Sequence, residues 1–221
     1  ARLLLEGRFD VVHNNALHRY LPRLSRAERL PMVTSLHIPP FKVLRGALMD
    51  GAAPWHLSSV VSARQRGIWW PEGAPETAHV VHNGIDLSEW PQGGPGDGSA
   101  VWAGRITPTK GTHLAAEAAQ IAGVPLRIYG VVEHQDYLND MVRPHLYDDV
   151  AYVGHLDTEA LGRAYGRASV ALFTPQWEEP FGLAAVEAMA TGLPVAATPH
   201  GAVKEVLGEA GVIAVDDSPV A

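Results

Sequence analysis

The chain has 221 residues, which is enough for one large α/β domain or two small ones. Apolar residues make up 47% and charged residues 19%, a globular composition that excludes an intrinsically disordered chain. The formal net charge of −7 argues against a nucleic-acid partner. The absence of cysteine excludes disulfide bonds and thiolate chemistry and favours a reducing, cytoplasmic location.

The first part of the chain alternates short apolar runs with helical or loop segments. Prolines at positions 39 and 40 force a break after the second run. Such alternation predicts parallel α/β structure rather than a β-sandwich. The expected strands are 10–14, 31–37, 58–62 and 78–81, and the expected helices are 1–7 and 63–68.

A Gly- and Pro-rich stretch without apolar periodicity covers residues 86–98. It predicts a hinge between two domains, residues 1–85 and residues 99–221. The second domain repeats the alternation in a Rossmann-like order. Its expected strands are 100–103, 125–129, 151–153, 169–173 and 194–197; its expected helices are 112–122 and 158–168, one from about 182 and one within 200–207, with irregular chain from about 130 to 149.

One stretch, residues 174–187 (TPQWEEPFGLAAVE), combines several features of a binding site. It follows a predicted buried strand and runs into an Ala-rich helix, and open α/β sheets bind ligands at such strand ends. Free amides at the helix start would suit phosphate. Glu187 falls about one turn inside a helix that begins near Gly182, so Glu179 and Glu187 are both expected at one cleft.

A second motif, GRITPTKG at residues 104–111, places Arg105 and Lys110 in a Gly-flanked turn after a predicted strand. It is neither a Walker loop nor a dinucleotide fingerprint, because the required glycine spacings are absent. Arginine grips two phosphate oxygens at once and lysine supplies a mobile charge, so the turn suits a diphosphate. No metal site is predicted: His13 and His18 are five apart, whereas ligands on one helix face are three or four apart.

Together, G-R-x4-K-G and the run EEPFGLAAVEAMATGLPVAAT resemble the signature of the family 4 retaining glycosyltransferases. The resemblance runs from about residue 8 to the end. It implies the GT-B fold, an α/β architecture of two Rossmann-like domains that face each other across a cleft. Family members are longer at both ends, so a partial chain with an incomplete first domain is expected. One departure is Ala202, which replaces the second glycine of a later G-G-x-x-E element and puts that turn in doubt.

The resemblance also implies roles for individual residues. Arg105 and Lys110 would hold the donor diphosphate, Glu179 would lie close to the donor hexose, and Glu187 would bind the ribose hydroxyls. His37, at the end of a predicted strand, would line the cleft near the transferred sugar. The implied catalytic residues are Arg105, Lys110, Glu179 and His37, and the implied donor-binding residues are Gly104, Glu187, Phe181, Gly182, Leu183 and His155, with the Gly130 turn near the base.

The implied activity moves a hexose from a UDP-, GDP- or TDP-linked sugar to a hydroxyl of a natural product, a lipid or a polysaccharide, with no metal and no cofactor. A glycosidase acid–nucleophile pair is rejected, because hydrolysis has no use for the cationic turn. Two alternatives stay open: a GT-B relative with a sugar-phosphate donor, and a non-catalytic nucleotide-sugar-binding subunit. Residues 41–49 (FKVLRGALM) fit a surface helix or a peripheral membrane contact.

Overall fold

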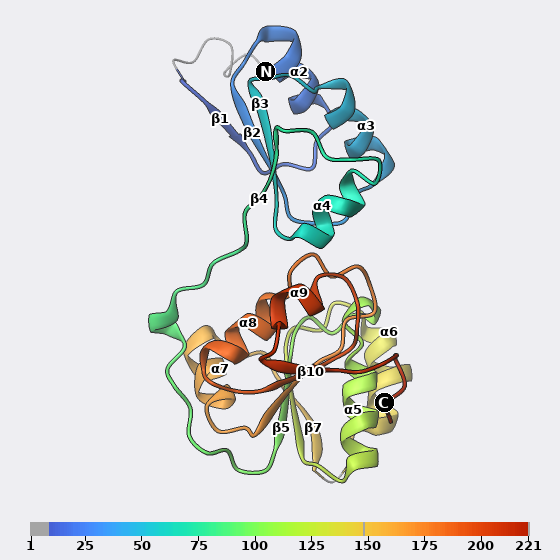
Figure 1. Ribbon diagram of the computed structural model, residues 1–221. Helices are drawn as coiled ribbons and strands as arrows, with labels where there is room; N and C mark the ends of the chain where they lie inside the picture. The colour runs from blue at the N-terminus through green and yellow to red at the C-terminus, as the bar shows by residue number, and fades with distance from the viewer. Residues whose placement is uncertain (1–8, 148, 221) are drawn as a thin grey trace. The chain divides into compact units, whose positions relative to one another are not determined.

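A computed structural model describes residues 9–147 and 149–220 of the chain (Figure 1). The helix expected at residues 1–7 lies outside the described residues. The chain divides into two compact units, Ala1–Asn83 and Gly84–Ala221.

The first unit contains a parallel sheet of four strands in the order β1-β2-β3-β4. The four predicted strands are thus confirmed, each within a few residues. Helices α2, α3 and α4 lie on one side of this sheet in Figure 1. The bounds are β1 Val12–Asn14, α2 Tyr20–Glu28, β2 Met32–Leu36, α3 Lys42–Asp50, β3 His56–Val60, α4 Ala63–Trp69 and β4 Ala78–Val80.

Alternation along the strands builds the core of the first unit. Met32, Thr34 and Leu36 of β2 are buried while the residues between them are half-exposed. Helix α3 matches the surface helix expected at residues 41–49, and it buries Leu44 and Leu48.

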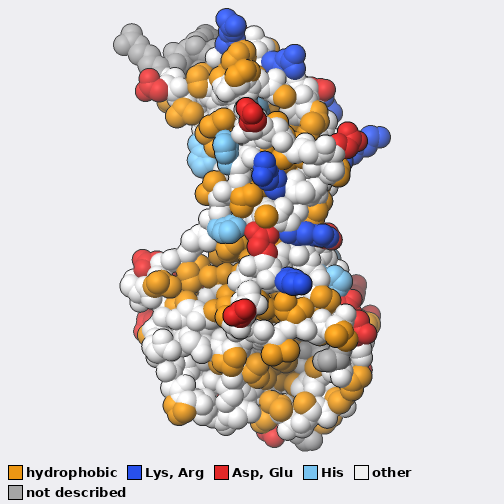
Figure 2. Space-filling model, in the orientation of Figure 1, with side chains coloured by type: hydrophobic (Ala, Val, Ile, Leu, Met, Phe, Trp, Pro, Cys, Tyr) orange, Lys and Arg blue, Asp and Glu red, His pale blue; other side chains and the backbone are white. Residues whose placement is uncertain are grey.

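On the face shown in Figure 2, Lys and Arg side chains are interspersed with acidic and apolar ones, and the described side chains on that face form no broad basic patch.

The second unit contains a parallel sheet of six strands in the order β10-β9-β8-β5-β6-β7. The chain builds β5, β6 and β7 outward, returns beside β5 to form β8, and then continues to β9 and β10. This reversal between β5 and β8 is the doubly wound arrangement that was predicted. The strands are β5 Ala100–Ala103, β6 Leu126–Tyr129, β7 Val150–Gly154, β8 Val170–Phe173, β9 Val195–Ala197 and β10 Gly211–Ile213.

Two hydrophobic clusters lie on opposite faces of this sheet. Figure 1 shows α5 and α6 on one side and α7 and α8 on the other. The prediction of irregular chain from about residue 130 to 149 was partly wrong, because short helical turns occupy residues 135–145. The helices are α5 Thr112–Ala122, α6 Gln135–Tyr137, α7 Thr158–Tyr165, α8 Leu183–Ala190 and α9 Val203–Leu207, with helical turns η1 Leu87–Glu89, η2 Pro108–Lys110, η3 Leu138–Val142 and η4 Arg143–His145.

Within the second unit, the segment that precedes β5 packs against the sheet and helices. Trp90 is buried in its core, 6% exposed, beside Tyr165. The amide of Gly93 donates to Thr191 O at 2.8 Å, and the amide of Asp97 donates to Arg167 O at 2.9 Å. The hinge at residues 86–98 stays a prediction.

Candidate functional site

The loops that follow β5 and β8 meet at the carboxyl edge of the sheet, where the strand order reverses. They are the two predicted motifs, residues 104–111 and residues 174–182. The amide of Gln176 donates to Thr109 O at 2.8 Å, and Thr174 Oγ1 donates to Gly111 O at 2.9 Å. The two motifs, more than 60 residues apart in sequence, therefore form one structure.

Gly111 makes this close approach possible. Its φ is +63°, and a Cβ at this position would lie 2.1 Å from Thr174 O. Any side chain would push the two loops apart, so the final glycine of G-R-x4-K-G is a steric requirement.

Lys110 and Glu179 form a largely buried ion pair across these loops. Lys110 Nζ lies 2.6 Å from Glu179 Oε2, and the two side chains are 17% and 7% exposed. Trp177 Nε1 donates to the same oxygen at 2.7 Å. Glu179 Oε1 has no hydrogen-bond partner among the described residues, so one carboxylate oxygen is left to accept a further donor.

The loop after β9 supports Glu179 from its backbone side. The amide of Ala202 donates to Glu179 O at 2.8 Å, and a Cβ at Gly201 would lie 2.2 Å from Glu179 N. Ala202 has φ −84° and ψ 5°, a conformation open to any residue. The turn that the missing second glycine put in doubt therefore forms without strain.

Helix α8 begins beside this pair with unused backbone donors. Gly182 has φ +97°, and a Cβ there would lie 2.9 Å from the Phe173 ring. No side chain caps the helix, and the amides of Leu183 and Ala184 have no acceptor within the described part of the chain. These amides and the helix dipole make a partly positive site. Phe181 is buried just before it.

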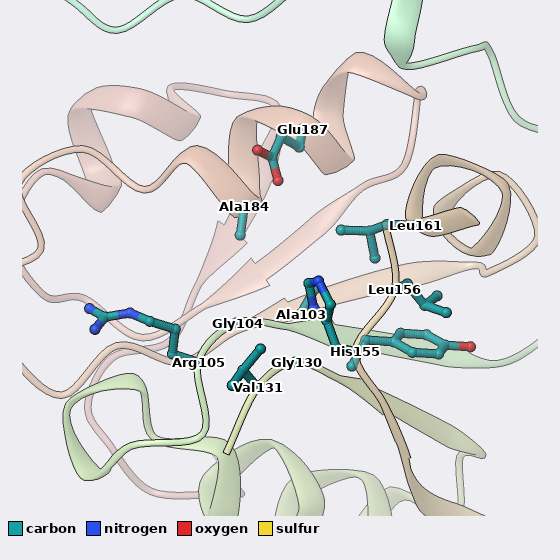
Figure 3. Close-up of a pocket in the computed structure, with 11 residues that line it drawn as sticks. Ala103, Gly104, Arg105, Gly130, Val131, His155, Leu156, Leu161, Ala184 and Glu187 are labelled. Carbon is teal, nitrogen blue, oxygen red and sulfur yellow. The ribbon is translucent and has the colours of Figure 1, made fainter. Parts of the chain in front are cut away.

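A pocket of about 230 Å³ opens at the carboxyl ends of β5, β6 and β7, beside α7 and α8 (Figure 3). It brings together four predicted site residues, Gly104, Arg105, His155 and Glu187, with the predicted Gly130 turn. The other lining residues, which the sequence reasoning missed, are Ala103, Tyr129, Val131, Leu156, Leu161 and Ala184. Of these, Tyr129 could have been predicted to line the site, because it ends a predicted strand at the same edge of the sheet.

Glu187 is the acidic residue of this pocket, and Figure 3 shows its carboxylate directed from α8 toward the pocket. It is half-buried and has no hydrogen-bond or ion-pair partner among the residues described. Burial raises the pKa of the Glu187 carboxyl above its ordinary value, because an incompletely solvated charge is disfavoured. Glu179 is not among the residues that line this pocket, so the two carboxylates occupy different surroundings.

Arg105 lies at the other end of the pocket, and its side chain extends away from Glu187 in Figure 3. Its Nη1 donates to both carboxylate oxygens of Glu133, at 2.8 and 3.1 Å. The two side chains are 56% and 41% exposed. An exposed ion pair of this kind contributes about 0–1 kcal/mol, so an incoming anion can replace Glu133 at low cost.

His37 belongs to the first unit, directly after β2. Its Nε2 lies 3.3 Å from Asn15 Oδ1 at the surface. Its predicted role beside the transferred sugar stays a prediction.

Within residues 9–147 and 149–220, no group of three or more His, Asp or Glu side chains is arranged to hold a metal ion. None of the helices in those ranges has the length and apolar character needed to cross a membrane.

Comparisons with known proteins match both units. Glycogen synthase of Mycobacterium tuberculosis is 35% identical over 145 residues, which cover 60% of this chain and 35% of that protein. Phosphatidyl-myo-inositol mannosyltransferase of Mycobacterium leprae is 30% identical over 233 residues, which cover 95% of this chain and 61% of that protein. The chain thus spans about a third of the first relative and about three fifths of the second.

Solved structures show the same fold at low sequence identity. Anabaena HepE in complex with UDP has a TM-score of 0.83 at 21% identity, with 96% of this chain and 66% of that chain covered. Sucrose-phosphate synthase from Thermosynechococcus elongatus has a TM-score of 0.76 at 19% identity, with 94% and 61% covered. The predicted GT-B class is confirmed.

The family model described as glycosyl transferases group 1 matches residues 95–219. This match covers more than half of the chain and includes every residue of both loop motifs and of the pocket. The chain belongs to the glycosyl transferases group 1 family.

Proposed function

We propose that this chain acts as a retaining, metal-independent family 4 glycosyltransferase that moves a hexose from a nucleoside-diphosphate sugar to a hydroxyl acceptor, in the cytoplasm. The observation that carries the proposal is the pocket at the strand reversal. It combines an unpaired carboxylate, Glu187, with Arg105 and the free amides at the start of α8. In this assignment the second unit binds the donor and the first unit the acceptor.

The nucleoside fits the pocket between Glu187 and the loops after β6 and β7. The half-buried Glu187 carboxylate accepts hydrogen bonds, and the two ribose hydroxyls would supply them. The apolar side chains of Leu156 and Leu161 offer a wall for the base. HepE has been crystallised with UDP and with UDP-glucose, so UDP is the first donor base to test.

The diphosphate fits between Arg105 and the α8 amides. Negative charge accumulates on this leaving group as the glycosidic bond breaks, and fixed donors stabilise it in the transition state. Arg105 would exchange Glu133 for phosphate oxygens. Lys110 keeps its pairing with Glu179 and has two further protons to donate.

The hexose fits beside Glu179. Its Oε2 is engaged by Lys110 and Trp177, and its Oε1 would accept a sugar hydroxyl. Retention follows if the acceptor attacks from the face that the phosphate leaves, with that phosphate accepting the acceptor proton. His37 would line the acceptor side of the transferred sugar. The relatives' names, a glycogen synthase and a phosphatidyl-inositol mannosyltransferase, favour a glycan or lipid acceptor.

Calorimetric titration with UDP, GDP and TDP tests the donor site. One nucleotide should bind selectively, and Glu187→Ala should weaken it at least tenfold while circular dichroism shows an unchanged fold. Absence of binding by the folded chain to all three would contradict the proposal. Transfer from a sugar phosphate that survives Glu187→Ala would favour the sugar-phosphate alternative, and binding without transfer would favour the non-catalytic subunit.

A further inference from the structure

A second pocket, here called the arginine pocket, lies on the sheet face that α7 partly covers. It encloses about 360 Å³, and three arginines, Arg127, Arg163 and Arg167, are among its lining residues. It extends from Tyr129 near the carboxyl edge of the sheet to Asp97 before β5. It shares Tyr129 and Leu156 with the proposed donor pocket but none of the polar groups Arg105, His155 and Glu187.

The strand and helix periods bring these arginines together. On β6, Leu126 and Ile128 pack in the cluster that faces α5, so Arg127 and Tyr129 project from the opposite face. Arg163 lies on α7, and Arg167 follows four residues later just beyond the helix end. Both line the pocket, Arg163 from the last turn of α7 and Arg167 from the chain just after the helix.

The cationic charge of this pocket is only partly compensated. Arg127 Nη1 donates to a neutral backbone carbonyl, Asp149 O, at 2.8 Å. Arg163 pairs with Glu159, whose side chain is 85% exposed and does not line the pocket. The Arg167 side chain has no hydrogen-bond or ion-pair partner within the described ranges.

One carboxylate, Asp97, lines the pocket with these three guanidinium groups, and its pKa is lowered by hydrogen bonds from Ser99 and, to a smaller extent, by the charge of Arg127. Its Oδ1 already accepts the amide and the hydroxyl of Ser99, at 2.9 and 2.6 Å. The pocket therefore keeps an excess of positive charge in a chain whose net charge is negative. Planar guanidinium groups match phosphate oxygens in pairs, so the charge suits a phosphate group.

The floor of the pocket limits the ligand further. Val101, Leu156 and Ala164 line it with apolar surface, next to Tyr129. Inorganic phosphate would leave this surface exposed to water. An aromatic or apolar group attached to the phosphate would cover it and gain the free energy of burial.

We propose that the arginine pocket binds a phosphate monoester that carries an aromatic or apolar group. The proposal does not depend on the donor site. Arg167 and Arg127 donate hydrogen bonds to the phosphate, and the aromatic or apolar group packs against the apolar lining of the pocket. Arg163 contributes when it is released from Glu159.

Calorimetry on the full chain with phenyl phosphate tests this. We expect saturable binding, tighter than for inorganic phosphate, and no binding of phenol. Arg167→Ala should weaken phenyl phosphate binding about tenfold or more, since it removes charge-assisted hydrogen bonds to the phosphate without removing a side-chain hydrogen bond or ion pair among the described residues. Arg143→Ala, a change at an exposed arginine outside the pocket, should have no effect. Glu159→Gln should tighten binding by freeing Arg163.

Arg105→Ala separates this pocket from the donor pocket. If phenyl phosphate binding is lost in Arg105→Ala and kept in Arg167→Ala, the phosphate sits in the donor pocket and the proposal is overturned. No saturable binding by the folded wild-type chain overturns it as well. Titration of UDP into Arg167→Ala keeps the two proposals apart, because the donor site should bind UDP there with unchanged affinity.

Discussion

The two cationic side chains of the G-R-x4-K-G motif differ in how far they are exposed to solvent. The Lys110 side chain is 17% exposed and faces a carboxylate that is 7% exposed, whereas Arg105 is 56% exposed. A buried charge depends on its partner, while an exposed charge is held by water. Lys110 and Arg105 therefore differ in what their removal does to stability, although the sequence motif treats them alike.

Lys110→Met should reduce the free energy of unfolding by about 3–5 kcal/mol, because it leaves the Glu179 carboxylate buried without its ion-pair partner. Urea denaturation at neutral pH measures this. The double change Lys110→Met with Glu179→Gln should recover most of the loss, since no unpaired charge remains. Equal stability of the wild type and Lys110→Met would show that Glu179 is solvated in solution and not held by Lys110.

Glu133→Gln should tighten the binding of the preferred nucleoside diphosphate severalfold. Glu133 holds the Arg105 guanidinium in the free chain, and the neutral amide competes less strongly with phosphate. Calorimetry gives the two affinities. Arg105→Ala supplies the control: in that background Glu133→Gln should change nothing, and an equal effect there would exclude competition for Arg105.

Glu187→Gln should make stability less dependent on pH. Because burial raises the pKa of Glu187 in the folded state above its ordinary 4.5, the stability from this carboxyl is full below about 4.5 and is lost as pH rises through the folded pKa. Glutamine does not titrate, so the variant should have a higher Tm than the wild type at pH 7 and lose this advantage near pH 4. A higher Tm at both pH values would point to packing instead.

Sequence patterns identified Arg105 and Lys110 as site residues but did not predict which side chains they pair with. Glu133 lies 28 residues after Arg105, and Glu179 lies 69 residues after Lys110. Each pairing follows from the sheet order, which joins β5 to β6 on one side and to β8 on the other. Nothing local in the sequence reports such a contact.

At the scale of elements, the strands with buried apolar runs were predictable and the weaker elements were not. Strand β10, Gly211–Ile213, has no buried residue, whereas the three-residue strands β1, β4 and β9 each bury at least one. Helix α2 contains Pro22, which argues against a helix although the first turn tolerates it. Both form because neighbouring elements supply the packing and hydrogen bonds that local propensity lacks. The doubly wound order was predictable from the alternation and from the right-handedness of crossovers.

Gly111→Ala should reduce the free energy of unfolding by more than the cost of placing alanine in a left-handed conformation, because its Cβ would also clash at the junction of the β5 and β8 loops. Gly111 and Gly123 have nearly equal φ, +63° and +64°, but a Cβ clashes with Thr174 O only at Gly111. Gly123→Ala should cost about 1–2 kcal/mol for the conformation. Gly111→Ala should cost clearly more and also weaken nucleotide binding. Equal losses in urea denaturation would mean that the loops separate freely.

At the scale of the molecule, the second unit contains everything that the proposed donor site needs. Both of its hydrophobic clusters are formed from residues after Gly84. The loops, the pocket and the start of α8 lie within it as well. A unit with its own core is expected to fold without the rest of the chain.

Two fragments test where this unit begins. The fragment 84–221 keeps Trp90, which is 6% exposed against Tyr165, and the backbone bonds from Gly93 and Asp97. It should unfold cooperatively and bind the nucleoside diphosphate as tightly as the full chain. The fragment 99–221, which starts after the predicted hinge, loses these contacts and should be less stable by at least the 3–5 kcal/mol typical of removing a buried tryptophan. Trp90→Ala in fragment 84–221 should reproduce most of that loss. If 99–221 proves as stable as 84–221, residues 86–98 are a hinge in the mechanical sense; if not, they are the first packed segment of the donor unit.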